Sequence, residues 1–95
     1  MKKLVQSTQY KKDLKRIRND AKKATALLDI LTKLENDIPI PQENRPHLLT
    51  GDYKGYMECL IQGDFLLIWF DPETDEIYLV RLGSHSELYG KGKKK

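Results

Sequence analysis

The chain has 95 residues, of which 39% are hydrophobic and 33% are charged, so it has room for one small soluble domain and excludes a second core. Its longest apolar run, Phe65 to Phe70, is far too short to cross a membrane, and the stretch MKKLVQSTQYKKD at the N-terminus lacks the apolar segment of a signal peptide. The single cysteine, Cys59, excludes an internal disulfide and is compatible with a reducing cytoplasm, where we expect the protein to act.

The formal net charge of +3 is unevenly distributed. Residues 1–23 carry nine Lys or Arg against two Asp, residues 24–90 carry four basic against twelve acidic residues, and residues 91–95 carry four lysines. Basic segments at both ends are typical of a protein that binds a polyanion. A solvated helix face and a frayed tail explain the same pattern equally well, so charge alone leaves both interpretations open.

The first third of the chain predicts a strand and two helices. A short strand is expected at Lys2 to Val5, and Ser7 or Thr8 can cap the helix that follows. Apolar side chains at helical spacing give this helix one face: Tyr10, Leu14, Ile17 and Ala21. After an interruption at Asn19-Asp20, a second apolar face follows: Leu27, Ile30, Leu31 and Leu34. Because the two helices are close in sequence, we expect an antiparallel hairpin.

Pro39 and Pro41 end the second helix, and a loop of roughly fifteen residues follows, long enough to indicate a role beyond connection. Three strands joined by short turns are then predicted, at residues 56–61, 65–70 and 77–82, which favours an antiparallel meander. The order β-α-α-β-β-β predicts one α+β domain over residues 1–90. We expect this domain to consist of a twisted antiparallel sheet of about four strands, with the helix hairpin packed on one face of the sheet. The basic tail, residues 91–95, is expected to be disordered.

Alternation along the strand at residues 56–61 divides its side chains between two faces. One set is apolar and suits the face toward the helices: Met57, Cys59 and Ile61. The other set lies on the opposite face, which we expect to be a concave, polar working surface: Tyr56, Glu58 and Leu60. Loops and strand ends beside that surface bring five ionisable residues together as candidate catalytic groups: His47, Glu58, Asp64, Arg81 and His85.

These residue types suit cleavage of a phosphodiester. A histidine moves a proton near neutral pH, a second acid or base serves the other oxygen, and Arg81 neutralises charge on the phosphate. The rings of Tyr89 and Phe65 can stack on an unpaired base. Each residue also has an ordinary structural explanation: Arg81 can pair with an acid, and His85 can follow Ser84 in a helix cap.

A metal centre is disfavoured, because the chain has no HxxxH or CxxC spacing and its one cysteine points toward the core. We therefore expect neither metal nor cofactor. A buried Cys59 is also a poor nucleophile.

Three segments carry a resemblance to a known family: HLLTGDYKGYMEC at 47–59, GDFLLIW at 63–69 and RLGSHSELY at 81–89. In this order they resemble the YafQ-type toxins of the RelE superfamily, the ribosome-dependent mRNA endonucleases of bacterial type II toxin–antitoxin modules. The resemblance implies a twisted antiparallel sheet with two N-terminal helices on one face. It also implies cleavage of mRNA in the ribosomal A site through attack by the RNA's own 2′-hydroxyl, which leaves a 2′,3′-cyclic phosphate and needs no metal.

Site roles follow from the resemblance. The motif positions of the family's catalytic and base-stacking residues correspond to His47, Glu58, Asp64, Phe65, Arg81, His85 and Tyr89. One position departs from the pattern, because Leu60 stands where the family commonly has a histidine. Leucine cannot transfer a proton, so we expect this chain to be weak or silent as a ribonuclease.

The resemblance also implies partners. They are the ribosome with its mRNA and a cognate antitoxin of the ribbon-helix-helix type, through which the toxin reaches operator DNA. Four basic residues of the first helix are expected to hold RNA or the ribosome: Lys11, Lys12, Lys15 and Arg16. Two alternatives stay open. A gyrase-poisoning ParE-like toxin is disfavoured by the histidines and acids, whereas Leu60 favours a degenerate toxin that only binds its antitoxin and co-represses the operon.

Overall fold

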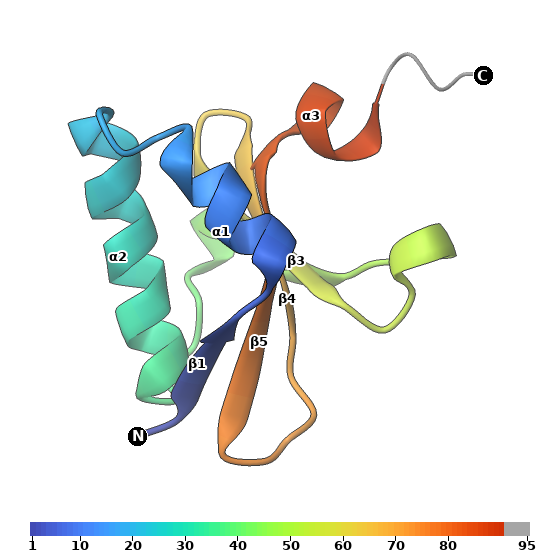
Figure 1. Ribbon diagram of the computed structural model, residues 1–95. Helices are drawn as coiled ribbons and strands as arrows, with labels where there is room; N and C mark the ends of the chain where they lie inside the picture. The colour runs from blue at the N-terminus through green and yellow to red at the C-terminus, as the bar shows by residue number, and fades with distance from the viewer. Residues whose placement is uncertain (91–95) are drawn as a thin grey trace.

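A five-stranded sheet in the order β1-β5-β4-β3-β2 forms the centre of the molecule (Figure 1). The computed structural model describes residues 1–90, so the predicted disorder of residues 91–95 lies outside the described part. The elements in chain order are β1 Lys3–Gln6, α1 Thr8–Lys15, α2 Ala21–Glu35, the 3-10 turn η1 Gln42–Asn44, β2 His47–Leu48, the 3-10 turn η2 Gly51–Tyr53, β3 Met57–Gln62, β4 Phe65–Phe70, β5 Glu76–Ser84 and α3 His85–Tyr89. No helix within residues 1–90 is long and apolar enough to cross a membrane.

The predicted α+β architecture and the antiparallel β3-β4-β5 meander are confirmed, with two corrections to the sheet. β1 pairs with β5 in parallel, so the sheet is mixed. The segment predicted to be only a loop contains β2, which pairs antiparallel with β3. A strand of two residues is too short to show alternation, and the partner of β1 lies some seventy residues away in the chain, so neither pairing leaves a local signal.

Two caps set the beginnings of the long helices. The Ser7 hydroxyl accepts from the backbone N–H of Tyr10 at 2.9 Å, and the Asp20 carboxylate accepts from that of Lys23 at 3.1 Å. Ala21, predicted to extend the face of the first helix, is instead the first residue of α2, because Asp20 starts a new helix before it. Ser7 also donates its hydroxyl to the Val80 carbonyl at 2.9 Å, which fixes the start of α1 to the edge of β5.

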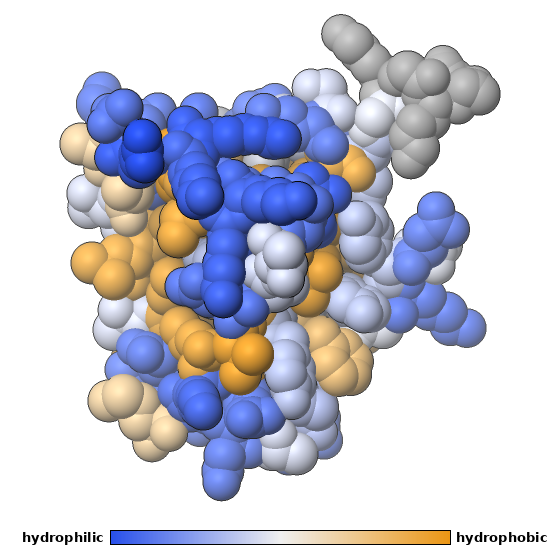
Figure 2. Space-filling model, in the orientation of Figure 1, coloured by the Kyte–Doolittle hydropathy of each residue, from blue (hydrophilic) through white to orange (hydrophobic). Residues whose placement is uncertain are grey.

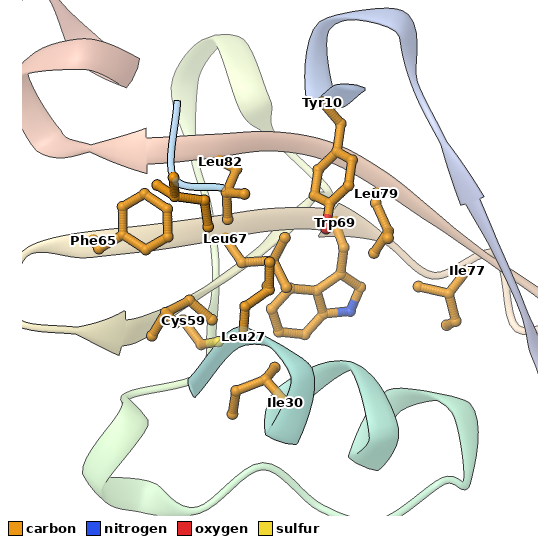
Figure 3. Packing of buried hydrophobic residues seen from close by; sticks show 12 residues of the cluster. Tyr10, Leu27, Ile30, Cys59, Phe65, Leu67, Trp69, Ile77, Leu79 and Leu82 are labelled. Carbon is orange, nitrogen blue, oxygen red and sulfur yellow. The ribbon is translucent and has the colours of Figure 1, made fainter. Parts of the chain in front are cut away.

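The main hydrophobic core lies between the sheet and the two long helices (Figure 3). Tyr10 reaches it from α1, and Leu27 and Ile30 from α2, over the rings and side chains of β4 and β5 (Figure 3). The predicted inward set of β3 is confirmed, since Cys59 and Ile61 are buried in this core and Met57 packs against it.

The opposite face of the sheet carries a second apolar cluster. Its buried members are Leu66, Ile68 and Leu88, and its partly buried members are Leu49, Tyr53, Tyr56, Leu60 and Val80. The predicted open, polar surface is therefore wrong over much of this face. The cause is the sequence FLLIWF of β4, which is apolar on both sides and requires cover on both. The segment around η2 and the helix α3 supply that cover.

Candidate active site

The site is centred on the carboxylate of Glu58 on β3. The short strand β2 places His47 directly opposite Glu58, with His47 Nε2 3.1 Å from Glu58 Oε1. The Tyr89 hydroxyl, from α3, donates to the other carboxylate oxygen, Oε2. Glu58 is only 4% exposed, and these two contacts supply the partners that a buried carboxylate requires. Residues from three separate segments thus meet at one acid.

Hydrogen-bond geometry defines the protons of the His47 ring. Nδ1 lies 2.7 Å from the carbonyl oxygen of Arg45, and because a carbonyl only accepts, Nδ1 carries a proton. Nε2 can then donate to Glu58 only when the ring holds both protons. Arg45 itself has a φ of 50°, a left-handed conformation that is unusual for a residue with a Cβ atom. The loop therefore fixes the orientation of the His47 ring between the Arg45 carbonyl and the Glu58 carboxylate.

The ring of Tyr89 forms the outer wall beside Glu58. Burial and then the hydrogen bond to Glu58 raise the pKa of Tyr89 well above its ordinary value, so its hydroxyl stays a donor. One edge of the ring meets Tyr53, with centroids 6.1 Å apart, and the ring of His85 lies at the same distance. Tyr89 as a whole residue is nevertheless 37% exposed.

His85 is the first residue of α3 and is exposed. Ser84 caps this helix: its hydroxyl accepts from the backbone N–H of Glu87 at 3.2 Å, and its own N–H donates to Glu87 Oε1 at 2.8 Å. The structural explanation of His85 as a cap neighbour is therefore correct, and it presents the imidazole at the rim of the site.

A shallow hollow of about 180 Å³ joins these groups. Its lining residues are Arg45, His47, Glu58, Leu60, Leu66 and His85. Three of the five predicted catalytic residues thus share one hollow. Leu60 lies among them and contributes only methyl groups where a polar side chain would face the same space.

Arg81 lies on the same face of the sheet but does not line the hollow. It pairs in register with Ile68 of the second cluster, and its guanidinium then reaches Asp13 of α1. Arg81 Nε lies 2.9 Å from Asp13 Oδ2, and Nη2 lies 3.4 Å from Oδ1. The hydrogen bond to Asp13 raises the pKa of Arg81 further above its already high value. The expectation that Arg81 pairs with an acid holds.

Asp13 is absent from the residues that the sequence predicts for the site. A signal was present, because Asp13 lies three residues after Tyr10 and four before Ile17, within the apolar stripe of the predicted helix. A charged residue in that stripe indicates a buried ion pair.

Asp64 and Phe65 lie outside this hollow. Asp64 is exposed in the turn after Gly63, and both residues line a different hollow, of about 280 Å³, beside α1 and α2. Phe65 is 4% exposed in the main core, with the Lys23 ammonium 5.1 Å from its ring centroid. This placement corrects the prediction that Phe65 stacks on RNA, because a residue that is 4% exposed offers almost no surface to a base.

The basic residues of α1 divide into two groups. Lys11, Lys12 and Lys15 are exposed on the outer side of the helix, where Figure 2 shows hydrophilic side chains gathered over α1. Arg16 instead takes part in ion pairs, with Nη1 3.6 Å from Glu87 Oε2 and 4.0 Å from Asp13 Oδ1. Arg16 therefore differs from the three lysines in that its charge lies near two acids.

Two other features bear on the chemistry. Within residues 1–90, no three His, Cys, Asp or Glu side chains are placed to hold a metal ion together. A larger hollow, of about 470 Å³, lies at the other end of the sheet near Ile38, Met57 and Trp69, and none of the predicted site residues lines it.

Comparisons with known proteins bear on the whole chain. A family model described as "Bacterial toxin of type II toxin-antitoxin system, YafQ" matches residues 2–90. A protein of Escherichia coli strain K12 named "mRNA interferase toxin YafQ" is 34% identical over 86 residues, which cover 88% of this chain and 91% of that protein.

Two solved structures of bacterial toxins have a similar fold. The YafQ chain in the DinJ-YafQ complex of E. coli has a TM-score of 0.82 at 27% identity and covers 95% of this chain and 100% of that one. A metal-bound toxin from Helicobacter pylori has a TM-score of 0.82 at 31% identity and covers 93% of this chain and 99% of that one.

Proposed function

The chain belongs to the YafQ family of bacterial type II toxin–antitoxin toxins, and from this premise we propose that it is an endoribonuclease that cleaves translated mRNA in the ribosomal A site. The observation that carries the proposal is the hollow shared by the His47–Glu58 pair and His85. Two proton-handling groups on one small surface are what phosphodiester cleavage requires. The E. coli relative is named an mRNA interferase, which supports the same reaction class.

The proposed reaction is a transesterification within the RNA. The 2′-oxygen bonds to the phosphorus while the bond from phosphorus to the 5′-oxygen breaks, which leaves a 2′,3′-cyclic phosphate and a 5′-hydroxyl. His85, exposed at the rim, takes the proton from the 2′-hydroxyl. Protonated His47 gives a proton to the leaving 5′-oxygen, and the buried carboxylate of Glu58 stabilises the charged ring until then.

Two further side chains complete the proposed site. Arg81 offsets charge on the phosphate as it builds up in the transition state, through N–H groups that Asp13 does not occupy. The exposed part of the Tyr89 ring stacks on an unpaired base. Asp64 and Phe65 are left out of this machinery because they line a different hollow, beside α1 and α2.

The proposed partners follow from the family and from charge. The DinJ-YafQ complex supports a cognate antitoxin for this chain, and we extend that to a ribbon-helix-helix protein that carries the toxin to operator DNA. The exposed lysines of α1, Lys11, Lys12 and Lys15, meet ribosomal RNA. A protein with these two partners acts in the bacterial cytoplasm.

A second candidate function rests on Leu60. This residue lines the hollow without a group that can transfer a proton, which favours a degenerate toxin that binds its antitoxin and represses the operon without cutting RNA. The two candidates differ in one measurable property, namely cleavage.

Purified ribosomes with a defined mRNA in translation provide the test. Primer extension maps the cut sites, and end analysis detects the cyclic phosphate. We expect weak cleavage by the wild-type chain, because of Leu60, and a further loss of about a hundredfold in His85→Ala, with Gln62→Ala at the exposed end of β3 as the unaffected control. Tight antitoxin binding without any mRNA cleavage would establish the second candidate instead.

A further inference from the structure

The carboxylate of Asp13 is the most heavily hydrogen-bonded acid beside the proposed site. It is 1% exposed and accepts from four donors: Arg81 Nε and Nη2, the backbone N–H of Leu82 at 2.9 Å, and Gln9 Nε2 at 3.1 Å. Burial alone would raise the pKa of Asp13, but the hydrogen bonds from Arg81 and Leu82 outweigh it and hold the pKa below its usual range. Asp13 is therefore a fixed negative charge at neutral pH.

This contact fixes the direction of Arg81. Asp13 occupies the edge of the guanidinium formed by Nε and Nη2, so Nη1 and the second N–H of Nη2 point away from Asp13. Tyr53 also interacts with the guanidinium, and the Tyr53 ring in turn contacts that of Tyr89 in the site. The side chain starts on the face of the hollow, because Arg81 pairs with Ile68, two residues along β4 from the lining residue Leu66. A planar fork held along one edge presents its other edge in one orientation only.

A second line of contacts joins Asp13 to the helix that carries His85. Arg16 Nη1 lies 4.0 Å from Asp13 Oδ1 and 3.6 Å from Glu87 Oε2. The other oxygen of Glu87 accepts from the backbone N–H of Ser84, the residue immediately before His85. Asp13 is thus connected to both ends of the segment from Arg81 to Glu87.

We propose that Asp13 is a positioning residue of the active site, which orients the free edge of the Arg81 guanidinium toward the scissile phosphate and secures the segment that presents His85. The inference rests on the proposed function and deepens it. Asp13 offsets the charge of Arg81, so the pair adds little to ground-state binding of RNA. Its effect belongs to the transition state and therefore to kcat rather than KM.

Asp13→Asn provides the test, because it keeps the size of the side chain, removes its charge and turns an NH₂ group toward one of the donors. Cleavage on programmed ribosomes should show kcat lower by roughly tenfold to a hundredfold, the scale on which a small misplacement of a reacting group acts, with KM nearly unchanged. The matched control is Asp20→Asn at the cap of α2, where asparagine caps equally well.

A double-mutant cycle separates positioning from a general loss of stability. If Asp13 acts through Arg81, Asp13→Asn costs little further activity in an Arg81→Ala background. An equal loss in both backgrounds would overturn the proposal.

NMR of the side-chain Nε–H groups gives a readout that does not need cleavage, and its comparison within the wild-type chain does not need a folded variant. In the wild-type chain, the Nε–H of Arg81 should exchange with solvent far more slowly than that of the exposed Arg18. The protection should disappear in Asp13→Asn. A wild-type chain that does not cleave RNA contradicts the proposed function but does not affect the NMR comparison. An Arg81 Nε–H that exchanges as fast as that of Arg18 overturns the role of Asp13.

Discussion

His47 and Glu58 face each other across the β2–β3 ladder, with Nε2 and Oε1 3.1 Å apart. The second nitrogen of His47 is held by the Arg45 carbonyl, and the second oxygen of Glu58 is held by the Tyr89 hydroxyl. The result is a line of four groups from a loop, through two strands, to the C-terminal helix. Since Glu58 is buried, its interactions are screened less by water than those of a surface pair.

Replacing Glu58 with glutamine should remove the charge interaction with His47 while keeping the shape of the side chain. The amide oxygen still accepts from Tyr89, but the charge that stabilises protonated His47 is lost. Cleavage should fall by about a hundredfold, while the free energy of unfolding changes by only about 1 kcal/mol. Single-turnover cleavage and thermal unfolding measure the two effects. Glu73→Gln in the exposed turn before β5 is the control, and equal activity of the two variants would remove Glu58 from the mechanism.

Gly83 is required for space and not for an unusual backbone angle. A Cβ atom there would lie 2.9 Å from Glu87 Oε1 and 3.2 Å from Leu88 Cδ2. Gly83→Ala should therefore displace Glu87 from its contact with Ser84 and lower stability by about 1–2 kcal/mol. Denaturant unfolding of Gly83→Ala, Glu87→Ala and the double variant checks this. The double variant should lose less than the sum of the single losses, and strict additivity would show that the two sites are independent.

The sequence predicted the fold through its strongest local patterns. The apolar run of β4, the helical stripes of α1 and α2 and the turn residues each decide one element without help from the rest of the chain. The strand β2, the parallel pairing of β1 and the cover over the second face depend on partners far away in sequence. For the same reason the sequence predicts only a loop position for His47. The pairing of His47 with Glu58 appears only in the structure.

Cys59 should be unreactive in the folded protein. Burial, and then the nearby charge of Glu58, raises the pKa of the thiol from 9.0 to about 12. Iodoacetamide at pH 8.5 should label the denatured chain within minutes and the native chain only as fast as it unfolds.

The same shift makes stability depend on pH. The thiol of the unfolded chain ionises above pH 9, whereas the folded thiol does not until about pH 12, so the free energy of unfolding should decrease as pH rises between these values. Cys59→Ala should lose this part of the pH dependence, and an unchanged slope would assign it to other groups such as Tyr10.

Ribosome binding should depend on the exposed lysines of α1. Reversing Lys11, Lys12 and Lys15 to glutamate should weaken binding strongly at low salt and reduce the slope of log affinity against log salt by about two. Lys→Arg at the same three positions keeps the charge and is the matched control. Arg16 is left unchanged because its contacts with Asp13 and Glu87 would confuse binding with folding. Ribosome affinity equal to wild type in the glutamate variant would show that this face serves another partner.

The site was harder to predict than the fold, because residue type and spacing do not show which groups share a surface. His47, Glu58 and His85 meet in one hollow, but Asp64 lies in another although it is as close in sequence to the strand ends. The motif position of Phe65 predicts that its ring stacks on an RNA base. Its burial instead follows from the tertiary packing of β4 in the main core.

Leu60→His is the most direct test of how far this chain retains the proposed activity. Leu60 lines the hollow between Glu58 and Leu66, so an imidazole there would face the groups that handle protons. Leu60 is partly buried against the second cluster, so the change should cost about 1–2 kcal/mol of stability, more than an exposed site would. mRNA cleavage on ribosomes should nevertheless rise by about a hundredfold, and expression should become more toxic.

The comparison needs equal amounts of folded protein, checked by thermal unfolding, and primer extension for each form. Leu60→Asn is the control, because it adds polarity without a group that transfers protons near neutral pH. A gain in the histidine form alone identifies a vacant acid or base position. If the leucine form already cuts as well as the histidine form, position 60 is not such a vacancy, and proton transfer rests on His47 of β2 and His85 of α3, with Glu58 of β3 paired to His47.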